Sequence, residues 1–396
     1  EAWLAAGQGD RVHGFMAGGD AALIRSIESF EDFPEYGARQ LMESGFGEGD
    51  LLVAITEGGE TPFVIGACLK AAEMAREDPW FLFCNPPDTL KRLAKRSQTV
   101  LEHPRVRPFC LRTGPMALAG STRLQATTVQ MLAAGAALSE ALGGEPAESL
   151  VARFRAWLGN GPREELVPFI EEEAAVYAAG ERVLYQTDDY GITVLTDTTE
   201  RAPTFSLAPF EHRRRGEEPA SLCYLSLPGT PDAGAAWRKL LQRPPRTLEW
   251  ESLADRASKA TLLGYDISGQ AAAWREARCP GLRQHSYHIG GGGPVLDFRG
   301  HRLDLKAGSE PLLVRHLALK CALNRQSTLA MGRLGCFESN LMTRVRPSNY
   351  KLVDRAARHV QHAHRQRTGR DLPYAEAVRQ VFEAGPPELT PPAGQR

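Results

Sequence analysis

The sequence has no long hydrophobic run, no secretion signal and no excess of charge of either sign. No apolar stretch approaches the ~20 residues that a transmembrane helix needs, and no signal peptide is recognisable near the start. The formal net charge is only -1 across 396 residues. A nucleic acid or a membrane surface is therefore not an expected partner, because binding to either generally needs a basic field.

Paired cysteines are also missing. The seven cysteines are odd in number and scattered, and none lies in a CxxC pair, which predicts reduced thiols in a cytoplasmic protein rather than a disulfide framework or a zinc site. His359, His362 and His364 lie close together but have no acidic or cysteine partner at ligand spacing. We interpret them as a solvated helix face, and we expect neither a metal nor a cofactor.

The composition is that of a soluble globular protein. Hydrophobic residues make up 42% and charged residues 24% of the chain. A length of 396 residues exceeds one ordinary core and predicts two or three domains. The sequence opens at Glu1 without an initiator Met, and we expect the chain to be incomplete at its N-terminus.

Residues 51–69, LLVAITEGGETPFVIGACL, carry the clearest local pattern. The apolar run 51–55 predicts a parallel strand with both faces buried. Residues 56–60 then form a turn, and Thr61 followed by Pro62 predicts the start of a helix. The free N–H groups of such a helix start can bind an anion, although an ordinary βα turn has the same signature and is more common.

Strand and helix patterns alternate along the chain, which is typical of parallel sheets. The series runs twice and predicts strands at 12–16, 51–55, 80–84, 106–111, 182–186, 221–227, 247–250 and 260–265. Helices are predicted at 21–30, 33–46, 121–142, 147–159, 167–179, 192–200, 232–241 and 270–278, with a mostly helical stretch from 311 to 365. We therefore expect two α/β domains, at residues 1–145 and 146–346, followed by a helical tail at 347–396.

Four motifs occur in an order that is specific when taken together. They are Ala17-Gly18-Gly19-Asp20 with Glu28-Ser29-Phe30-Glu31-Asp32, the Thr61-Pro62 helix start, Gly120-Ser121-Thr122-Arg123, and Asn349-Tyr350-Lys351-Leu352-Val353-Asp354-Arg355-Ala356. They resemble the AGGD, ExxED, GSTR and NxKLxxRA elements of the sugar isomerase (SIS) family, particularly N-acetylmuramic acid 6-phosphate etherases and the related tandem-domain glucokinase regulatory proteins. The resemblance implies flavodoxin-like, three-layer α/β/α domains with parallel sheets.

A further segment that resembles the etherases lies later in the chain. Residues 197–200, DTTE, followed by 203–205, PTF, resemble the etherase segment DxxExxPTF, whose glutamate acts as an acid; Glu200 occupies that position here. The two-domain layout with a C-terminal NxKLxxRA motif resembles the regulatory proteins more than the single-domain etherases. The resemblance implies either a monomer that is a pseudo-dimer or a homodimer, and it leaves room for a protein partner.

The resemblance implies a set of site residues for a sugar phosphate or an amino-sugar phosphate. Glu31 corresponds to the base of an etherase, with Glu28 as a weaker candidate, although most glutamates are simply solvated. Lys351 and Arg355 lie four apart on one helix face and can clamp a phosphate, or they form part of a basic solvated stripe. The predicted ligand-binding residues are Gly58, Gly59, Glu60, Thr61, Ser121, Thr122, Arg123, Asn349, Lys351 and Arg355.

The chain departs from the etherase pattern in its loops. The etherase loop has Ser-Gly-Arg before Thr-Pro, whereas this chain has Gly58-Gly59-Glu60 preceded by Glu57. Carboxylates near a phosphate dianion repel it unless cations compensate. Gln125 stands where the family has a lysine, and the second domain has the acidic loop 187–190 instead of a glycine-rich one. The second site is therefore expected to be degenerate.

These observations leave three hypotheses. The first is a binding or regulatory protein in which an SIS scaffold binds a sugar phosphate. The second is an enzyme, either an etherase-like lyase that cleaves the lactyl ether with Glu31 as its base or a sugar-phosphate isomerase. The third is a structural pseudo-dimer that has lost its ligand. The acidic loop favours the first or third hypothesis, and the retained motifs keep the second open.

Overall fold

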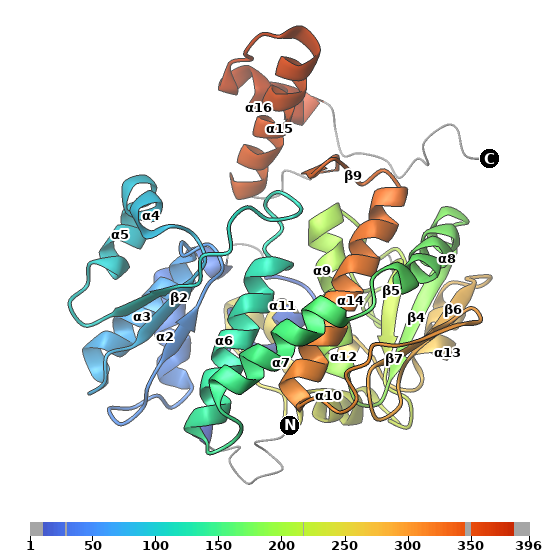
Figure 1. Ribbon diagram of the computed structural model, residues 1–396, viewed down its shortest axis with the longest axis horizontal. Helices are drawn as coiled ribbons and strands as arrows, with labels where there is room; N and C mark the ends of the chain where they lie inside the picture. The colour runs from blue at the N-terminus through green and yellow to red at the C-terminus, as the bar shows by residue number, and fades with distance from the viewer. Residues whose placement is uncertain (1–10, 28–29, 217, 345–349, 384–396) are drawn as a thin grey trace.

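The chain folds around two separate β-sheets with helices between and around them (Figure 1). The computed structural model describes residues 11–27, 30–216, 218–344 and 350–383. The first sheet is parallel, with strand order β1-β2-β3 and register Ala54 to Phe81 and Leu82 to Phe109. Its strands are β1 (Val53–Ile55), β2 (Trp80–Phe83) and β3 (Arg107–Cys110).

The prediction that the first strand is buried on both faces is wrong. Ala54 is 5% exposed and packs into the core, whereas Val53 and Ile55 are 39% and 40% exposed. Side chains alternate between the two faces of a strand, so one face of β1 packs on α3 while the described residues leave the other partly open. The unalternated apolar run therefore does not reflect two buried faces.

Helix α3 forms the main cover of this sheet. Pro62 occupies its first turn, as predicted, and the helix is buried on two sides. Ile65 and Cys68 contact the sheet core, while Ala67 and Ala71 pack with Leu41 of α2. The helical elements around this sheet are η3 (Phe30–Asp32), α2 (Pro34–Glu43), α3 (Pro62–Met74), α4 (Pro87–Leu93) and α5 (Lys95–Leu101). The preceding turn η2 (Asp20–Leu23) packs instead into the core of the second sheet through Ala21.

The second sheet is mixed rather than parallel throughout. Its order is β5-β4-β6-β7-β8, in which β5, β4 and β6 run parallel while β7 and β8 are antiparallel additions. The run 290–293 forms the β6–β7 turn, where Gly291 and Gly292 adopt positive φ. The strands are β4 (Arg182–Thr187), β5 (Cys223–Ser226), β6 (Gln284–Gly290), β7 (Val295–Phe298) and β8 (His301–Asp304).

Several other predicted elements are corrected. Residues 260–265 belong to a helix, α12 (Lys259–Gly264), whose N-cap Ser258 accepts a bond from the Thr261 N–H. Residues 247–250 form no strand; Leu248 and Trp250 pack instead in the cluster that contains Phe30 and Phe63. No strand forms at 12–16, and the helix predicted at 21–30 is limited, in its described part, to the short turns η2 and η3.

Helices α6, α7 and α14 lie between the two sheets (Figure 1). Helix α14 packs against α6 and α7 on one side and against α8 and α9 on the other. The helical elements from here on are α6 (Gln125–Ala141), α7 (Ala147–Asn160), η4 (Glu164–Leu166), α8 (Val167–Ala178), α9 (Gly191–Phe205), α10 (Ala233–Leu241), η5 (Glu251–Leu253), α11 (Ala254–Ala257), α13 (Ala271–Arg278) and α14 (Leu312–Arg333).

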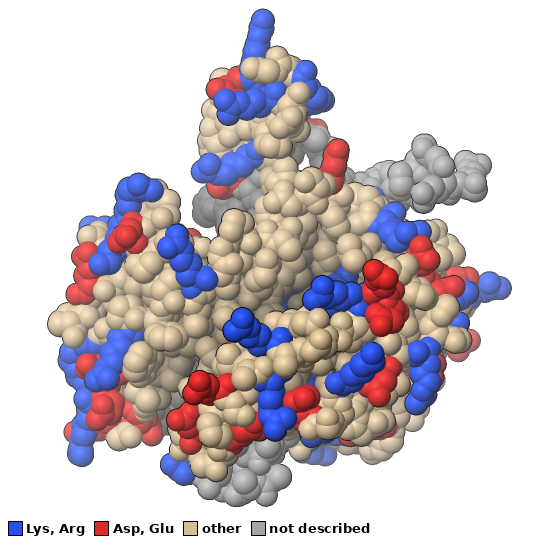
Figure 2. Space-filling view, in the orientation of Figure 1, with Lys and Arg blue, Asp and Glu red and all other residues tan. Residues whose placement is uncertain are grey.

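The C-terminal part forms a helical hairpin. A short antiparallel pair, β9 (Phe337–Glu338) and β10 (Leu341–Met342), leads to α15 (Tyr350–Thr368) and α16 (Tyr374–Glu383), which pack on each other and project from the body (Figure 1). Figure 2 shows acidic and basic side chains interspersed over the body, in keeping with the small net charge. No helix in the described ranges has both the length and the apolar character of a membrane span.

The close packing of α2 on α3 gives a direct test of the fold. A Cβ added at Gly66 would lie 1.9 Å from the Pro34 carbonyl oxygen, so the helices must separate to admit it. We predict that Gly66→Ala lowers the free energy of unfolding by at least about 2 kcal/mol, measured by urea denaturation. Gly159→Ala in α7, where nothing lies within 4 Å, is the control and should be neutral or stabilise by up to about 1 kcal/mol.

Candidate functional site

The loop between β1 and α3, residues 56–61, is held in place through its carbonyl groups. The Glu57 oxygen accepts a bond from the Cys84 N–H at 3.0 Å, and the Gly58 oxygen accepts one from Asn85 Nδ2 at 3.0 Å. Ser97 Oγ donates to the Gly59 oxygen at 2.8 Å. Arg96 Nε donates to the Glu60 oxygen at 2.6 Å. Four successive carbonyls are thus bonded to the surrounding protein.

The N–H groups of the same residues have no such partners. Within the described part of the chain, no group accepts a hydrogen bond from the N–H of Glu57, Gly58, Gly59 or Glu60. The turn depends on Gly59, which has a φ of 78°. Because the loop leads directly into the N-terminus of α3, these N–H groups and the helix dipole both favour an anion. The geometry therefore fits the anion-binding loop predicted from the sequence.

The GSTR segment, residues 120–123, lies next to this loop at the start of α6. Thr127 Oγ1 donates to Glu57 Oε1 at 3.1 Å, and Gln130 Nε2 donates to the Thr56 carbonyl at 3.0 Å. The structure therefore brings the loop and the N-terminal turns of α6 together. Ser121 is buried and Thr122 is half-buried.

The side chain of Arg123 is engaged with the helices that cover the second sheet. It is 6% exposed and donates to Asp197 of α9 at 3.0 Å, and to the Ser327 and Thr328 hydroxyls of α14 at 3.3 and 3.2 Å. Its Nε is buried without a partner in the described part of the chain. Three of its bonds to the protein therefore lead away from the loop, and its role as a ligand residue remains a prediction.

Asp197 is the centre of a buried ionic network. Its Oδ1 accepts bonds from Arg123, Asn324 and Ser327, while its Oδ2 accepts two bonds from Arg201. Burial disfavours the charged carboxylate, but the Arg201 and Arg123 guanidiniums more than offset this cost and lower the pKa of Asp197 from 3.8 to about 2. The network therefore keeps Asp197 ionised.

Arg201 extends this network toward the second sheet. It donates to Glu173 at 2.6 Å and to the Tyr185 hydroxyl at 2.9 Å, and all three groups are buried. Gln326 of α14 donates to the other Glu173 oxygen at 2.7 Å. The charges are thus paired and hydrogen-bonded, as buried charges need to be.

Lys320 of α14 holds the end of the GSTR segment in place by hydrogen bonds to its backbone. Its ammonium lies 2.8 Å from the Arg123 carbonyl, 3.2 Å from the Leu124 carbonyl and 2.8 Å from the Thr128 hydroxyl. Burial lowers the pKa of Lys320 from 10.5 to about 8. This lysine is therefore a positioning residue for the start of α6, and its contacts also direct it away from solvent.

Glu31 lies close to the start of α3 but is exposed. Its neighbour Phe30 packs against Phe63, the second residue of α3, with ring centroids 5.7 Å apart. This contact places the segment that contains Glu31 beside the start of α3, the helix that follows the loop. Glu28, the weaker candidate, lies outside the described residues.

The C-terminal motif is only partly described. Asn349 lies outside the described residues, and Lys351 and Arg355 are placed only through the backbone of α15. Their spacing of four residues puts both on one side of that helix. In the etherase-like segment 197–205, Glu200 is exposed on α9, while Asp197, about one turn earlier, is buried. The predicted roles of these residues remain predictions.

Two cation positions were missed by sequence reasoning. Arg96 contacts the loop, because its Nε donates a hydrogen bond to the Glu60 carbonyl. Nothing in its sequence context distinguishes it from the neighbouring basic residues of α5. Lys320 is one of several basic residues in the second half of the sequence. Its position four residues before a polar stretch was the available signal, because such a run is unusual on a buried helix. The stretch comprises Asn324, Arg325, Gln326, Ser327 and Thr328.

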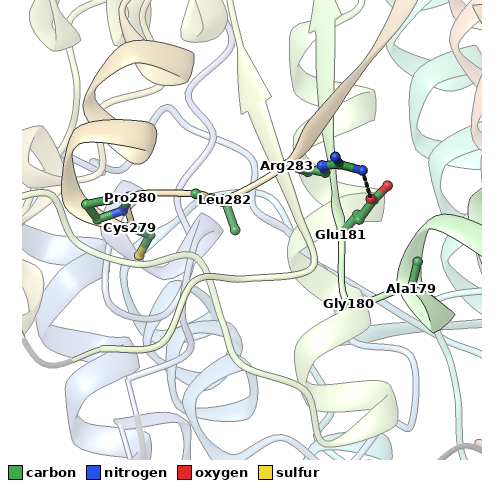
Figure 3. Close-up of a pocket in the computed structure, with 8 residues that line it drawn as sticks. Ala179, Gly180, Glu181, Cys279, Pro280, Leu282 and Arg283 are labelled. Atoms are coloured by element: carbon green, nitrogen blue, oxygen red, sulfur yellow. Dashed lines mark hydrogen bonds and ion pairs between the residues drawn. The ribbon is translucent and has the colours of Figure 1, made fainter.

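A separate shallow pocket of about 370 Å³ lies in the second sheet, at the N-terminal ends of its strands β4 and β6. Figure 3 shows the loop residues that line it, with Arg283 and Glu181 paired at 3.2 Å. Ligands of open parallel sheets bind outside the C-terminal ends of the strands. The β1–α3 loop, which lies at that end of the first sheet, is therefore the better candidate site.

Comparison with known proteins finds a family similarity in the N-terminal part of the chain. Residues 2–73 match the family model described as the glucokinase regulatory protein N-terminal SIS domain. This part of the chain is therefore related to SIS domains, as the motifs predicted.

The curated relatives are named N-acetylmuramic acid 6-phosphate etherase. The protein of Synechococcus elongatus is 42% identical over 120 residues, which cover 30% of this chain and 35% of the relative. That of Mesorhizobium japonicum is 39% identical over 123 residues, 31% of this chain and 36% of the relative. That of Aliivibrio fischeri is 35% identical over 123 residues, 31% and 37% of the two chains. The chain thus spans about a third of the length of the curated relatives it matches.

The buried network predicts a large effect of Asp197→Asn. The amide removes the charge that Arg123 and Arg201 share, and breaking a buried ion pair costs about 3–5 kcal/mol. We expect a loss of that size in the free energy of unfolding at pH 7, measured by urea denaturation. Because the folded pKa of Asp197 is depressed, the difference from the wild type should be full above pH ~4 and should shrink as the pH falls toward about 2.

Asp188→Asn is the matched control for this measurement. Asp188 is bonded to Lys239 at 2.8 Å, but its side chain is 63% exposed, and exposed ion pairs contribute less than about 1 kcal/mol. Equal effects of the two substitutions would contradict the assigned importance of the buried network.

Proposed function

We propose that this chain binds a sugar phosphate, or a related carbohydrate derivative, at the β1–α3 loop and the neighbouring start of α6. The observation that carries the proposal is the row of loop N–H groups without acceptors in the described residues, in front of the N-terminus of α3. Their carbonyls are bonded to the protein behind them, so the loop is organised before a ligand arrives. The SIS family match over residues 2–73 supports the same site.

The proposal includes an arrangement of the whole chain. We propose a first SIS unit in residues 1–145, a second, degenerate unit in 146–346 and a helical tail in 347–396. The two sheets support this division, although Ala21 and Leu118 pack into the core of the second sheet. A regulatory role with a protein partner, in a pseudo-dimeric monomer or a homodimer, is compatible with such an arrangement.

A thermal titration tests ligand binding. A ligand that binds only the folded chain stabilises it by about 2.7 kcal/mol at 100 times its dissociation constant. We expect glucose 6-phosphate, glucosamine 6-phosphate or N-acetylmuramic acid 6-phosphate to raise the melting temperature by several degrees, and inorganic phosphate or glucose at equal ionic strength to have a smaller effect. If none of the three sugar phosphates shifts the melting temperature, the proposed function is refuted and the hypothesis of a non-binding structural protein is favoured.

Gly59→Ala locates the binding site within the same titration. An added Cβ would lie 2.7 Å from Leu90, in a residue with positive φ, so the loop must distort. The ligand-induced shift should be lost. Gly45→Ala is a matched control, because Gly45 has a similar φ of 84° but nothing within 4 Å. This variant should keep the shift even if its starting melting temperature is lower.

An etherase-like lyase is the second candidate function. Two observations favour it: the curated relatives carry the etherase name, and the Glu31 segment packs beside the start of α3. In this reaction Glu31 would take the C2 proton of the sugar while a second acid protonates the leaving ether oxygen. A sugar-phosphate isomerase would also need a base at this position.

Product analysis separates catalysis from binding. If the chain is an etherase, incubation with N-acetylmuramic acid 6-phosphate releases lactate, which proton NMR detects, and Glu31→Gln reduces the rate at least 100-fold. Glu35→Gln, which changes another exposed glutamate nearby, should leave the rate unchanged. Binding without lactate release would favour the regulatory reading.

A further inference from the structure

The charges around the β1–α3 loop do not suit a ligand that is only an anion. Glu57 and Glu60 both belong to the loop. The nearby cations Arg123 and Lys320 are buried and bonded to Asp197 and to main-chain carbonyls. Arg96 is the described cation that touches the loop directly, through the Glu60 carbonyl. The loop therefore combines N–H donors that favour a phosphate with carboxylates that repel it.

Glu57 is the better positioned of the two carboxylates. Its main-chain oxygen accepts a bond from the Cys84 N–H at 3.0 Å. Its Oε1 lies 3.1 Å from the Thr127 hydroxyl, which is also 3.1 Å from the Thr122 carbonyl oxygen. No group in the described ranges donates to its Oε2. The side chain is half-buried at the junction of the loop with α6. The Glu57 side chain thus lies at the candidate site with one oxygen next to Thr127 and the other without a donor among the described residues.

A ligand that carries both charges resolves this conflict. The phosphate of an amino-sugar phosphate suits the loop N–H groups, and its protonated amine suits a carboxylate, which forms stronger bonds with charged donors than with neutral ones. Acetylation of the amine removes that charge and adds bulk. We infer that Glu57 is a specificity-determining residue that accepts a hydrogen bond from the ammonium group of an amino-sugar phosphate. This inference rests on the proposed sugar-phosphate site.

Calorimetric titration of the whole chain tests the inference. Glucosamine 6-phosphate should bind at least about 10-fold more tightly than glucose 6-phosphate, which has a hydroxyl at the same carbon, and than N-acetylglucosamine 6-phosphate. Glu57→Gln keeps the shape and an oxygen for Thr127 but removes the charge. It should weaken glucosamine 6-phosphate binding about 10-fold and leave the other two ligands within about 3-fold.

Glu77→Gln is the control, since it removes the same charge from an exposed residue between α3 and β2, at the opposite end of α3 from the loop. Its effect on the preference should stay below about 3-fold. An equal loss in both variants would show a general effect of net charge and overturn the assignment to Glu57.

The wild-type chain alone also decides the question if Glu57→Gln does not fold. Similar affinities for the amine and the hydroxyl ligand would overturn the inference while leaving sugar-phosphate binding intact. Failure of all three ligands to bind would instead refute the proposed function, and the inference with it.

Discussion

The carboxylate of Asp197 joins α9 to the start of α6 and to α14. One of its oxygens accepts a bond from Arg123, at the end of the GSTR segment, and the other accepts bonds from Arg201 on its own helix. Both arginines and the aspartate are almost completely buried. Charges in such a place are tolerated only when each is paired and hydrogen-bonded, so the positions of α6, α9 and α14 are mutually constrained.

This constraint reaches the candidate site through α6. Asp197 and Lys320 fix the first turn of that helix, and the next residues, Thr127 and Gln130, contact the β1–α3 loop. The loop therefore takes part of its geometry from residues that follow it by more than a hundred positions. Under the proposed division of the chain into two units, the units are not independent of each other, because residues of α9 and α14 hold the start of α6.

Sequence patterns predicted the elements whose signals are local. The apolar run 51–55 and Pro62 gave β1, the loop and the start of α3 within about two residues. The same patterns predict a strand where α12 forms, because an apolar run follows the Ser258 cap. They do not predict β6 to β8, whose sequences contain many polar side chains. The orientation of Arg123 was not predictable from its motif, because its partner Asp197 lies 74 positions away. Contacts of that separation depend on the assembled fold.

The difference between this loop and the family pattern has two opposite effects. A glutamate at position 60, where the resemblance implies an arginine, weakens the attraction for a phosphate, and Arg96 of α5 restores a positive charge on the loop from another element. Glu57, next to Thr127, adds an acceptor beside the N–H donors. A site with separated donors and a charged acceptor discriminates by geometry as well as by net charge. Under the proposed function, the change in the loop therefore alters which sugar phosphate is selected without requiring the loss of the site.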